Sequence, residues 1–294
     1  MWGSKKWWSI VILALLALIP LAGFSARKPP KQAKTETVSD SADLVTGSKL
    51  SYEQMEKFLR EGQIKKTKGT SKGITGSIRA TLSDGKITHD VHITTIDEEK
   101  ARFEGTRGVE LNFRDTYKFN IAAWRLAKII GLGAYVPMSI DRHYQGKGAA
   151  FTWWADNILM DEETHQKKKK KIEAPDIEAF NRQMYFVHVF DQLIYNVDRN
   201  LGNLLITKDW HLWLIDHTRA FRLYTTLENA KTLKKCDRVL LANLKTLTEP
   251  QLMAELKDYV RPGEIRGLLA RRNLIVKYFE SQPPDALYDL LKKP

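Results

Sequence analysis

The chain has 294 residues, 43% of them hydrophobic and 28% charged, which excludes a largely disordered protein and allows a leader followed by one large domain or two lobes. Its formal net charge of +12 favours anionic partners, namely nucleotides and other phosphates, nucleic acid or an acidic membrane surface, without choosing among them. The single cysteine, Cys236, excludes an internal disulfide and a cysteine-based zinc site within this sequence.

The first 26 residues predict a signal peptide or a membrane anchor. Lys5 and Lys6 precede an apolar run over residues 9–24, in the order of the basic and hydrophobic regions of a secretory leader. The run is short for a membrane span, and basic residues stand on both sides of it, so the orientation is not fixed. A cleaved signal and a retained anchor both stay open. We therefore expect a membrane-anchored or exported protein, with the side of the membrane undecided.

Residues 27–48 are rich in Pro, Ser, Thr and Lys and predict a flexible linker. Residues 49–160 then predict a first lobe made of an antiparallel sheet and helices. Its first helix is expected to begin after Ser51 and to stop at Gly62. Alternating and helical patterns add the following elements: a hairpin about residues 83–86, a third strand over 100–105, a helix that ends at Gly131 or Gly133, and a hairpin about residues 145–148.

Residues 161–294 predict a second lobe that is mainly helical. It opens with a polar loop over residues 161–176, whose lysine run is expected to be a solvated surface, with a phosphate or lipid contact as the alternative. A long helix follows over residues 176–196. Two short strands then flank a turn at Lys208 and Asp209, and the chain after Leu227 is expected to be helical throughout.

Two Asp-containing clusters stand on either side of these short strands: Asp198-Arg-Asn-Leu-Gly-Asn203 and Ile215-Asp216-His217. A hairpin would bring Asn203 and Asp216 to the same end, where an amide oxygen and a carboxylate suit Mg²⁺. Asp198 would then orient or deprotonate an attacking hydroxyl, as phosphoryl transfer requires. The alternative is that both clusters are ordinary turn and capping residues.

Three further side chains near these clusters have simpler interpretations. We expect Arg199 to tie its loop to a neighbouring carboxylate, and His217 to be a hydrogen-bonded core histidine rather than a metal ligand. Arg219 and Arg222 either meet an anionic group or form surface ion pairs.

The two clusters resemble the catalytic and metal-binding loops of the atypical kinases that include phosphatidylinositol 3/4-kinases, HipA-like kinases and secretory-pathway kinases, and a bacterial group among them in particular. The resemblance covers roughly residues 75–225. It implies an α+β, two-lobed protein-kinase-like fold with a β-rich first lobe and an α-rich second lobe. It also implies ATP as co-substrate, Mg²⁺ or Mn²⁺ as cofactor, Asp198 as the catalytic residue, and Asn203 and Asp216 as metal ligands.

The sequence departs from the family where the phosphates of the nucleotide would be held. Such kinases carry a lysine on the third strand and a glutamate on the next helix, but Glu104 and Asn120 stand at these positions. Arg102, on the same strand, could replace the lysine and would bind the nucleotide beside Glu104. The other candidate cations are Arg107, Arg114 and Lys118.

The nucleotide would also need a cover for its phosphates and a pocket for its base. The turn at residues 83–86 is the better placed glycine segment to cover phosphates, although an ordinary hairpin turn is the favoured interpretation. Trp153 and Trp154 fall on the strand that leads to the hinge, so they either line the adenine pocket or pack between the lobes.

The expected function is an ATP-dependent phosphotransferase acting on a protein, lipid or small-molecule hydroxyl. The alternative is a membrane-tethered pseudokinase that binds a nucleotide or a metal as a scaffold. A nucleic-acid-binding protein is supported only by the net charge, because no recognition motif is present. The expected partners are a nucleotide, an unidentified phosphoacceptor and the membrane, through the N-terminal segment.

Overall fold

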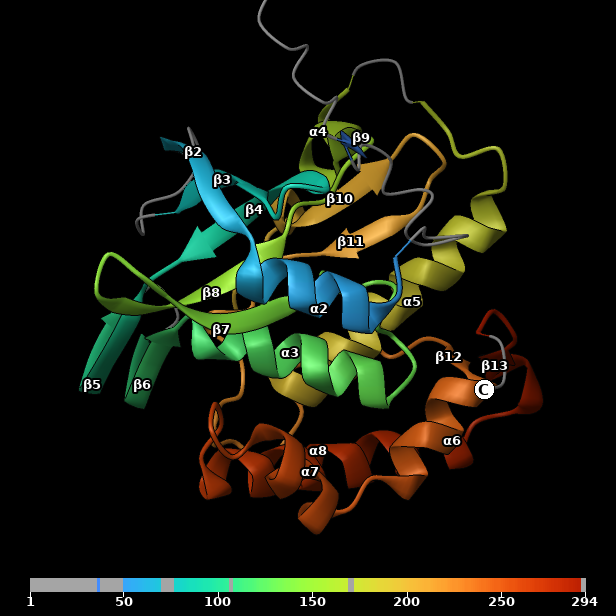
Figure 1. Cartoon of the computed structure of the whole chain (residues 1–294). Coiled ribbons are helices and arrows are strands. Elements are labelled where there is room, and N and C mark those ends of the chain that lie inside the picture. The colour runs from blue at the N-terminus through green and yellow to red at the C-terminus, as the bar shows by residue number, and fades with distance from the viewer. Residues whose placement is uncertain (1–35, 38–49, 70–76, 106–107, 169–171, 292–294) are drawn as a thin grey trace, which may run out of the picture. The chain divides into compact units, whose positions relative to one another are not determined.

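The computed structural model describes residues 36–37, 50–69, 77–105, 108–168 and 172–291 (Figure 1). The predicted leader, residues 1–26, and most of the predicted linker lie outside these residues. The described residues belong to one unit, Thr35–Pro294. Among their helices, none combines the length and the apolar character needed to cross a membrane.

A six-stranded sheet dominates the first part of the described chain, with the order β2-β3-β4-β8-β7 and β1 beside β4. Its strands are β1 (Glu36–Thr37), β2 (Gln63–Gly69), β3 (Ile78–Ser83), β4 (Ile87–Thr94), β7 (Ser139–Tyr144) and β8 (Lys147–Trp153). Only the pairing of β1 with β4 is parallel. One face of the sheet carries Leu82, Val91 and Ile93, all fully buried, so this face forms the core of the first lobe.

Both predicted hairpins of this sheet are confirmed. Between β3 and β4, Asp84 Oδ1 accepts hydrogen bonds from the backbone N–H groups of Lys86 and Ile87, and Gly85 has a φ of +91°. Between β7 and β8, Gln145 and Gly146 both have positive φ, which suits a two-residue turn between twisted strands. Local turn chemistry therefore fixes these two connections.

Helices α2 (Tyr52–Glu61) and α3 (Lys118–Ile129) pack against β7 and β8 and confirm the two predicted helices (Figure 1). Ser51 Oγ accepts from the backbone N of Gln54, and the Gln54 side chain accepts from the backbone N of Ser51, which is a capping box. At the other end, the backbone N of Gly62 donates to Phe58 O. The cap and the stop thus fall where the sequence predicts them.

The predicted third strand does not join the main sheet, and this expectation is wrong. Strand β5 (Asp97–Gly105) pairs with β6 (Gly108–Thr116) in a separate two-stranded sheet, whereas β4 pairs directly with β8. The physical reason is the composition of β5, which has charged side chains on both faces and is exposed along almost its whole length. Such a strand has no apolar face to bury between two strands of the core.

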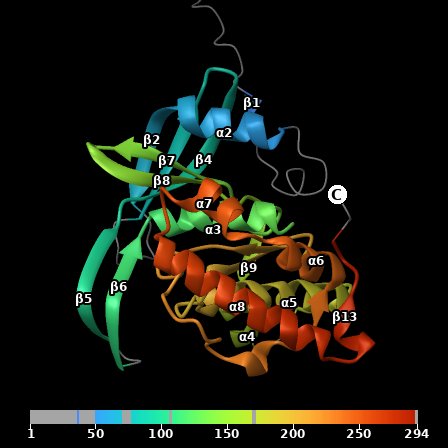
Figure 2. The ribbon, with the colours of Figure 1, turned by 90° about the horizontal axis from the view of Figure 1, so that it is seen from below.

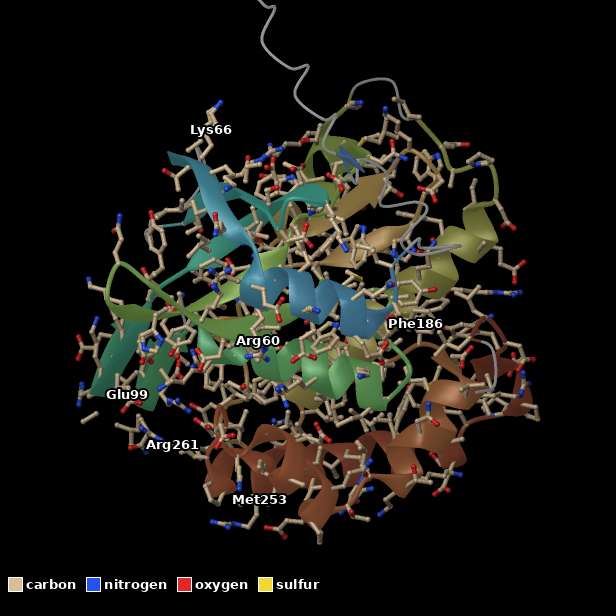
Figure 3. All side chains as sticks on the ribbon, viewed as in Figure 1. Arg60, Lys66, Glu99, Phe186, Met253 and Arg261 are labelled. Atoms are coloured by element: carbon tan, nitrogen blue, oxygen red, sulfur yellow. The ribbon has the colours of Figure 1, made fainter. Side chains whose placement is uncertain are left out.

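The second part of the chain is mainly helical, as predicted, with the three helices α6, α7 and α8 near its end (Figure 2). Helix α5 packs against α8, which also contacts α6 and α7, and the aromatic ring of Phe186 on α5 is fully buried (Figure 3). The elements are β9 (Ile158–Asp161), α4 (Glu162–Lys167), α5 (Ile177–Ile194), η1 (Leu201–Asn203), β10 (Leu204–Thr207), β11 (Leu212–Leu214), η2 (Ala230–Thr232), β12 (Cys236–Asp237), α6 (Arg238–Thr246), α7 (Glu249–Leu256), α8 (Pro262–Glu280), η3 (Pro284–Ala286) and β13 (Leu287–Tyr288).

Two local predictions in this part need correction. The first half of the expected polar loop is helix α4, because Asp161 caps it by accepting from the backbone N of Thr164. The stretch after Leu227 forms only the short turn η2 and the two-residue strand β12 before α6 begins. Residues 169–171, the last three residues of the lysine run, lie outside the described residues.

Ion pairs connect the β5–β6 sheet to the start of α8. Arg114 of β6 binds both carboxylate oxygens of Glu264 at 2.7 Å, and each of these side chains is only 5% exposed. Glu99 of β5 meets Arg261 at 2.6 Å in the exposed rim of the same contact (Figure 3). Helix α3 also contacts α7, so the sheet-rich and helical parts are joined at several places.

Candidate active site

The hairpin formed by β10 and β11 brings the two sequence motifs together. Leu204 pairs with Leu214, and the backbone N of Ile215 donates to Asn203 O at 3.1 Å. Asn203 and Asp216 therefore stand at the same end of the hairpin. The turn at the other end closes when the backbone N of Trp210 donates to Thr207 O, which confirms the predicted position of the turn.

Arg199 holds the two motif loops in register. Its guanidinium pairs with the Asp191 carboxylate on α5 at 3.0 Å. Its Nη1 also donates to Asn203 O at 3.2 Å and to Ile215 O at 2.6 Å. The side chains of Arg199 and Asp191 are only 10% and 11% exposed. The predicted tie to a carboxylate is thus confirmed, and the same side chain fixes the backbone on both sides of the candidate metal site.

Asp198 follows the end of α5 and faces solvent. The helix ends at Tyr195, which has a left-handed φ of 52°, and the side chain of Asn196 then accepts from the backbone N of Asp198. The Asp198 side chain is 53% exposed, so a substrate hydroxyl can reach it. Its Oδ2 lies 3.3 Å from Nη1 of Arg219, whose Nε lies 3.5 Å from Asp115 Oδ2. Arg219 is therefore engaged in ion pairs with these two carboxylates and is not available as a binding site for another anion.

Asp216 has a left-handed backbone, with a φ of 56°, and an exposed side chain. Its Oδ1 accepts from the hydroxyl of Thr218 at 3.2 Å, which orients one carboxylate oxygen. The other nearby carboxylate is Asp115, where burial raises the pKa and the charge of Asp216 raises it further, against Arg219. Two carboxylates therefore lie close together beside Thr218.

His217 lies in the core, as the sequence predicts, but its ring Nε2 has no hydrogen-bond partner among the described residues. Its ring packs edge-on against Phe190, and burial lowers its pKa well below the usual value, so it is neutral at pH 7. Its backbone N donates to Asn120 Oδ1 at 2.7 Å. Asn120 of α3 thereby supports the backbone next to Asp216.

The donor set at this end of the hairpin suits a hard cation with few protein ligands. In the residues that the structure describes, no group of three or more His, Cys, Asp or Glu side chains could hold a metal ion. Mg²⁺ commonly binds through one or two carboxylates together with waters and substrate phosphates, and an amide oxygen is acceptable to it. Asp216 and Asn203 fit such a site, in which the nucleotide would complete the coordination.

The nucleotide-binding residues expected on the third strand pair with each other and with none of the motif residues in the described part of the chain. Arg102 and Glu104 pair with each other at 2.8 Å on β5 and are 63% and 72% exposed. Strand β5 does not belong to the main sheet, so the structure does not bring them together with Trp153 and Trp154. The remaining candidate cations are occupied or undescribed: Arg114 pairs with Glu264, Lys118 with Asp97, and Arg107 lies outside the described residues.

The two tryptophans end β8 with different surroundings. Trp153 is 2% exposed, stacks on His89 and meets Phe58 of α2, so it packs in the core of the first lobe. Trp154 lies under the guanidinium of Arg79, at 4.3 Å from its ring centroid, and edge-on to His92. Trp154 therefore shares a face of the sheet with Arg79 of β3 and His92 of β4.

His92 is a residue that the sequence reasoning missed. It lies on β4, the strand that occupies the place expected for the third strand, and its Nε2 is 2.6 Å from the hydroxyl of Ser77. Burial lowers the pKa of His92, and the nearby charge of Asp216 acts in the opposite direction. His92 is thus a side chain of β4 close enough to Asp216 for the charge of that carboxylate to act on it. Alternation along β4 could have indicated it, because Val91 and Ile93 are buried on the other face.

The turn at residues 83–86, expected to cover phosphates, lies at the far end of β4 from His92. Five residues separate Ile87 from His92, which corresponds to about 16 Å along a strand. The opposite end of the sheet, where Ile78 pairs with both Gly69 and Ile93, is next to His92. The segment 70–76, which contains Gly73 and Gly76, joins β2 to β3 at that end and lies outside the described residues.

No known family matches this sequence, and no curated protein shows significant similarity to it. Among solved structures, the chain is similar to the proinflammatory kinase CtkA of Helicobacter pylori, with a TM-score of 0.49 and 10% identity over 76% of this chain and 99% of that chain. It is similar to the MAP kinase LmaMPK10 of Leishmania major with a TM-score of 0.29 and 10% identity over 86% and 93%. Likenesses of this strength decide nothing about function, which has to be argued from the site itself.

Proposed function

We propose that the protein is a kinase-like phosphotransferase that transfers a phosphoryl group from ATP to a hydroxyl with the help of Mg²⁺ or Mn²⁺. The observation that carries the proposal is the pair of hydrogen bonds that Arg199 donates to the carbonyl oxygens of Asn203 and Ile215. It supports a site in which Asp198, Asn203 and Asp216 act together, rather than two unrelated turns. Such preorganised placement is the main contribution of a protein to phosphoryl transfer.

Each residue then has a distinct role. Asn203 and Asp216 would hold the divalent cation, which neutralises charge on the phosphates when it is bound. Asp198, exposed and beside Arg219, would accept the proton of the attacking hydroxyl. Arg199 and Asn120 position the backbone of these groups. Membrane attachment through residues 1–26 stays a prediction, because these residues lie outside the described part of the chain.

A pseudokinase that only binds a nucleotide is the second candidate, and one observation favours it. The described cations proposed to replace the strand lysine are all paired elsewhere, and the side chain of β4 on which the charge of Asp216 acts is a histidine, His92. Burial lowers the pKa of this histidine, so it brings no full positive charge at pH 7. Without that charge the protein would hold the phosphates less firmly.

A thermal-shift titration of the full-length protein tests the proposal. ATP, ADP and GTP are added with Mg²⁺, Mn²⁺ or EDTA, to wild type and to Asp216→Ala. Ligand at 100 times its dissociation constant should stabilise the folded state by about 2.7 kcal/mol. We expect a metal-dependent shift with ATP that is lost in Asp216→Ala. The matched control is Asp209→Ala, at the opposite end of the same hairpin, which should keep the shift.

Transfer of radiolabelled phosphate from ATP, to water or to the protein itself, separates the two candidates. An active enzyme should lose this transfer in Asp198→Asn while it keeps the thermal shift. A wild-type protein that binds ATP with metal but shows no transfer would be a pseudokinase. The absence of any nucleotide-dependent shift would refute both.

A further inference from the structure

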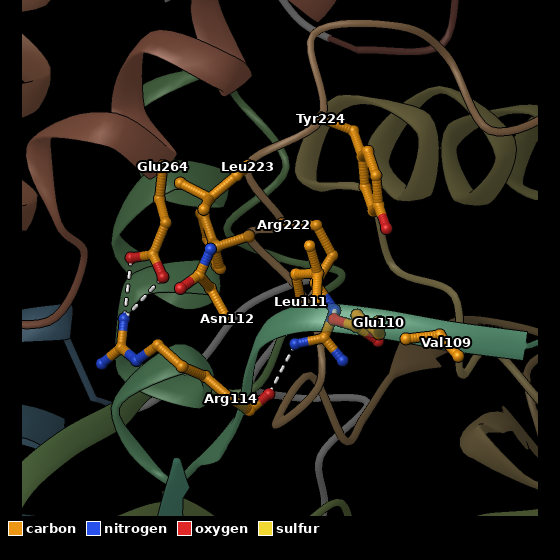
Figure 4. Close-up of a pocket in the computed structure, with 10 residues that line it drawn as sticks. Val109, Glu110, Leu111, Asn112, Arg114, Arg222, Leu223, Tyr224 and Glu264 are labelled. Atoms are coloured by element: carbon orange, nitrogen blue, oxygen red, sulfur yellow. Dashed lines mark hydrogen bonds and ion pairs between the residues drawn. The ribbon is translucent and has the colours of Figure 1, made fainter. Parts of the chain in front are cut away.

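A cavity of about 310 Å³ lies between strand β6 and the segment 221–224, and it contains none of the candidate active-site residues (Figure 4). Four large apolar side chains on its lining are exposed: Val109, Leu111, Leu223 and Tyr224, at 51%, 65%, 44% and 44%. Apolar side chains that gather on one exposed patch mark binding surfaces rather than the ordinary scatter of surface hydrophobics.

The polar lining of the cavity contains a buried donor that has no partner among the described residues. The side chain of Arg222 is only 4% exposed, and its Nε lies 2.7 Å from Glu110. Its Nη1 donates to Arg114 O at 2.5 Å (Figure 4), but its Nη2 has no hydrogen-bond acceptor in the part of the chain that the structure describes. Buried donors are almost always paired in folded proteins. An oxygen acceptor supplied by a ligand in this cavity would pair it.

Strand β6 offers an open edge beside the same cavity. Among the described strands it pairs only with β5. On its other side, Arg114 O accepts from Arg222, and the backbone N of Thr116 donates to Thr218 O at 2.9 Å. The segment after Asp216 thus covers only the end of this edge, and residues 109–112 line the cavity. An open strand edge with exposed apolar side chains is a template for an added strand.

We propose that this cavity binds an extended polypeptide segment, which adds to the open edge of β6. An apolar side chain of the segment lies among Leu111, Leu223 and Tyr224, and a carbonyl oxygen of the segment accepts from Arg222 Nη2. A lipid acyl chain would fit the apolar lining but would leave this donor unpaired. The segment 216–224 links the cavity to Asp216, so the bound polypeptide is the phosphoacceptor; this last step alone rests on the proposed function.

The test uses the full-length protein and a positional-scanning library of fluorescein-labelled nonapeptides, with binding measured by fluorescence anisotropy in the absence of nucleotide and metal. We expect saturable binding of peptides with an aliphatic residue at one central position. Pools with proline at the two central positions should bind about tenfold more weakly, because proline cannot donate to a strand ladder. Binding that is equal with and without proline, or no binding by any pool, overturns the proposal.

Variants locate the site. Leu111→Glu should weaken binding about tenfold, because it removes an aliphatic contact that the bound peptide would bury. Leu274→Glu is the control, since Leu274 is also exposed, at 40%, but stands ten residues after Glu264 on α8, or about 15 Å away. Equal binding by both variants overturns the proposal. Binding to phosphatidylcholine–phosphatidylglycerol vesicles that depends on Leu111, without peptide binding, assigns the surface to lipid and overturns it as well.

The same peptide assay on Asp216→Ala separates this inference from the proposed function. Peptide binding should persist in that variant, because Asp216 does not line the cavity. Peptide binding without any nucleotide-dependent thermal shift would leave the docking site standing and refute the phosphotransferase. A nucleotide-dependent thermal shift without peptide binding would leave the phosphotransferase standing and refute the docking site.

Discussion

Asn120 accepts a 2.7 Å hydrogen bond from the backbone N of His217, 97 residues further along the chain. The contact joins helix α3 of the first lobe to the residue that follows Asp216. Since Asn120 is 7% exposed, water does not replace it easily. The Asn120 side chain therefore has a structural role, since it holds the backbone beside Asp216.

Asn120→Ala should lower the free energy of unfolding by about 1–3 kcal/mol, because a buried backbone N–H loses its acceptor. It should also weaken the metal-dependent nucleotide shift, since the backbone beside Asp216 is released. Urea denaturation measures the first effect and the thermal titration the second. Asn181→Ala, at an exposed position of α5, is the control. A loss below 0.5 kcal/mol in Asn120→Ala, about the effect of a surface substitution, would contradict the assigned role.

Arg199→Met should destabilise the protein by about 3–5 kcal/mol, because it leaves the nearly buried Asp191 carboxylate without its cation. Arg238→Met removes an exposed pair with Asp289 and should cost less than about 1 kcal/mol. The double variant Arg199→Met with Asp191→Leu should recover stability in chemical denaturation but not nucleotide binding. Recovery of both would mean that Arg199 only stabilises the fold and does not position the site.

His92→Ala should weaken nucleotide binding by about tenfold, as expected for a lost hydrogen bond to a charged phosphate. The comparison is His143→Ala, an exposed histidine of β7 in the same sheet. Isothermal titration with ATP and Mn²⁺ gives both dissociation constants. Equal affinities for the two variants would show that β4 does not contact the phosphates.

Stability should fall in acid between about pH 6.5 and pH 4. Burial lowers the pKa of His211 to about 4, below its usual value of 6.5. The unfolded chain therefore binds more protons in this range, so the contribution of His211 is complete above pH 6.5 and is lost as the pH falls to about 4. The shift corresponds to about 3 kcal/mol.

Urea unfolding measured from pH 7 to pH 4.5 checks this dependence. His211→Gln keeps a donor for the carbonyl oxygen of Ala134, which His211 Nε2 meets at 2.8 Å, and it removes the titration. The variant should therefore show a smaller loss of stability in acid than wild type. An identical pH dependence of the two proteins would exclude His211 as its source.

Local chemistry made much of the fold predictable from the sequence. Ser51 and Gly62 bound α2 through a cap and a stop, and the turn at Lys208 and Asp209 set the register that places Asn203 opposite Ile215. These features depend on neighbours within a few residues, which a sequence pattern contains. The coarse layout of a sheet-rich part followed by a helical part follows from the same periodicities.

Long-range relationships were not predictable in the same way. The alternation of β5 indicates a strand but not its partner. Arg102 and Glu104 were therefore expected in the main sheet, where β4 in fact pairs directly with β8, whereas β5 pairs with β6. The proximity of His92 to Asp216 depends on how the sheet lies over the β10–β11 hairpin. Partner choice between strands is decided by burial across the whole fold, which a single strand pattern does not record.

The buried pair of Arg114 and Glu264 has a consequence for cooperativity. It joins a strand of the first lobe to a helix of the second, so separating the lobes would break a buried pair in which Arg114 binds both carboxylate oxygens of Glu264. Independent melting of the two lobes is therefore costly. We expect the described part of the chain to unfold in one calorimetric transition, with equal calorimetric and van't Hoff enthalpies, rather than lobe by lobe.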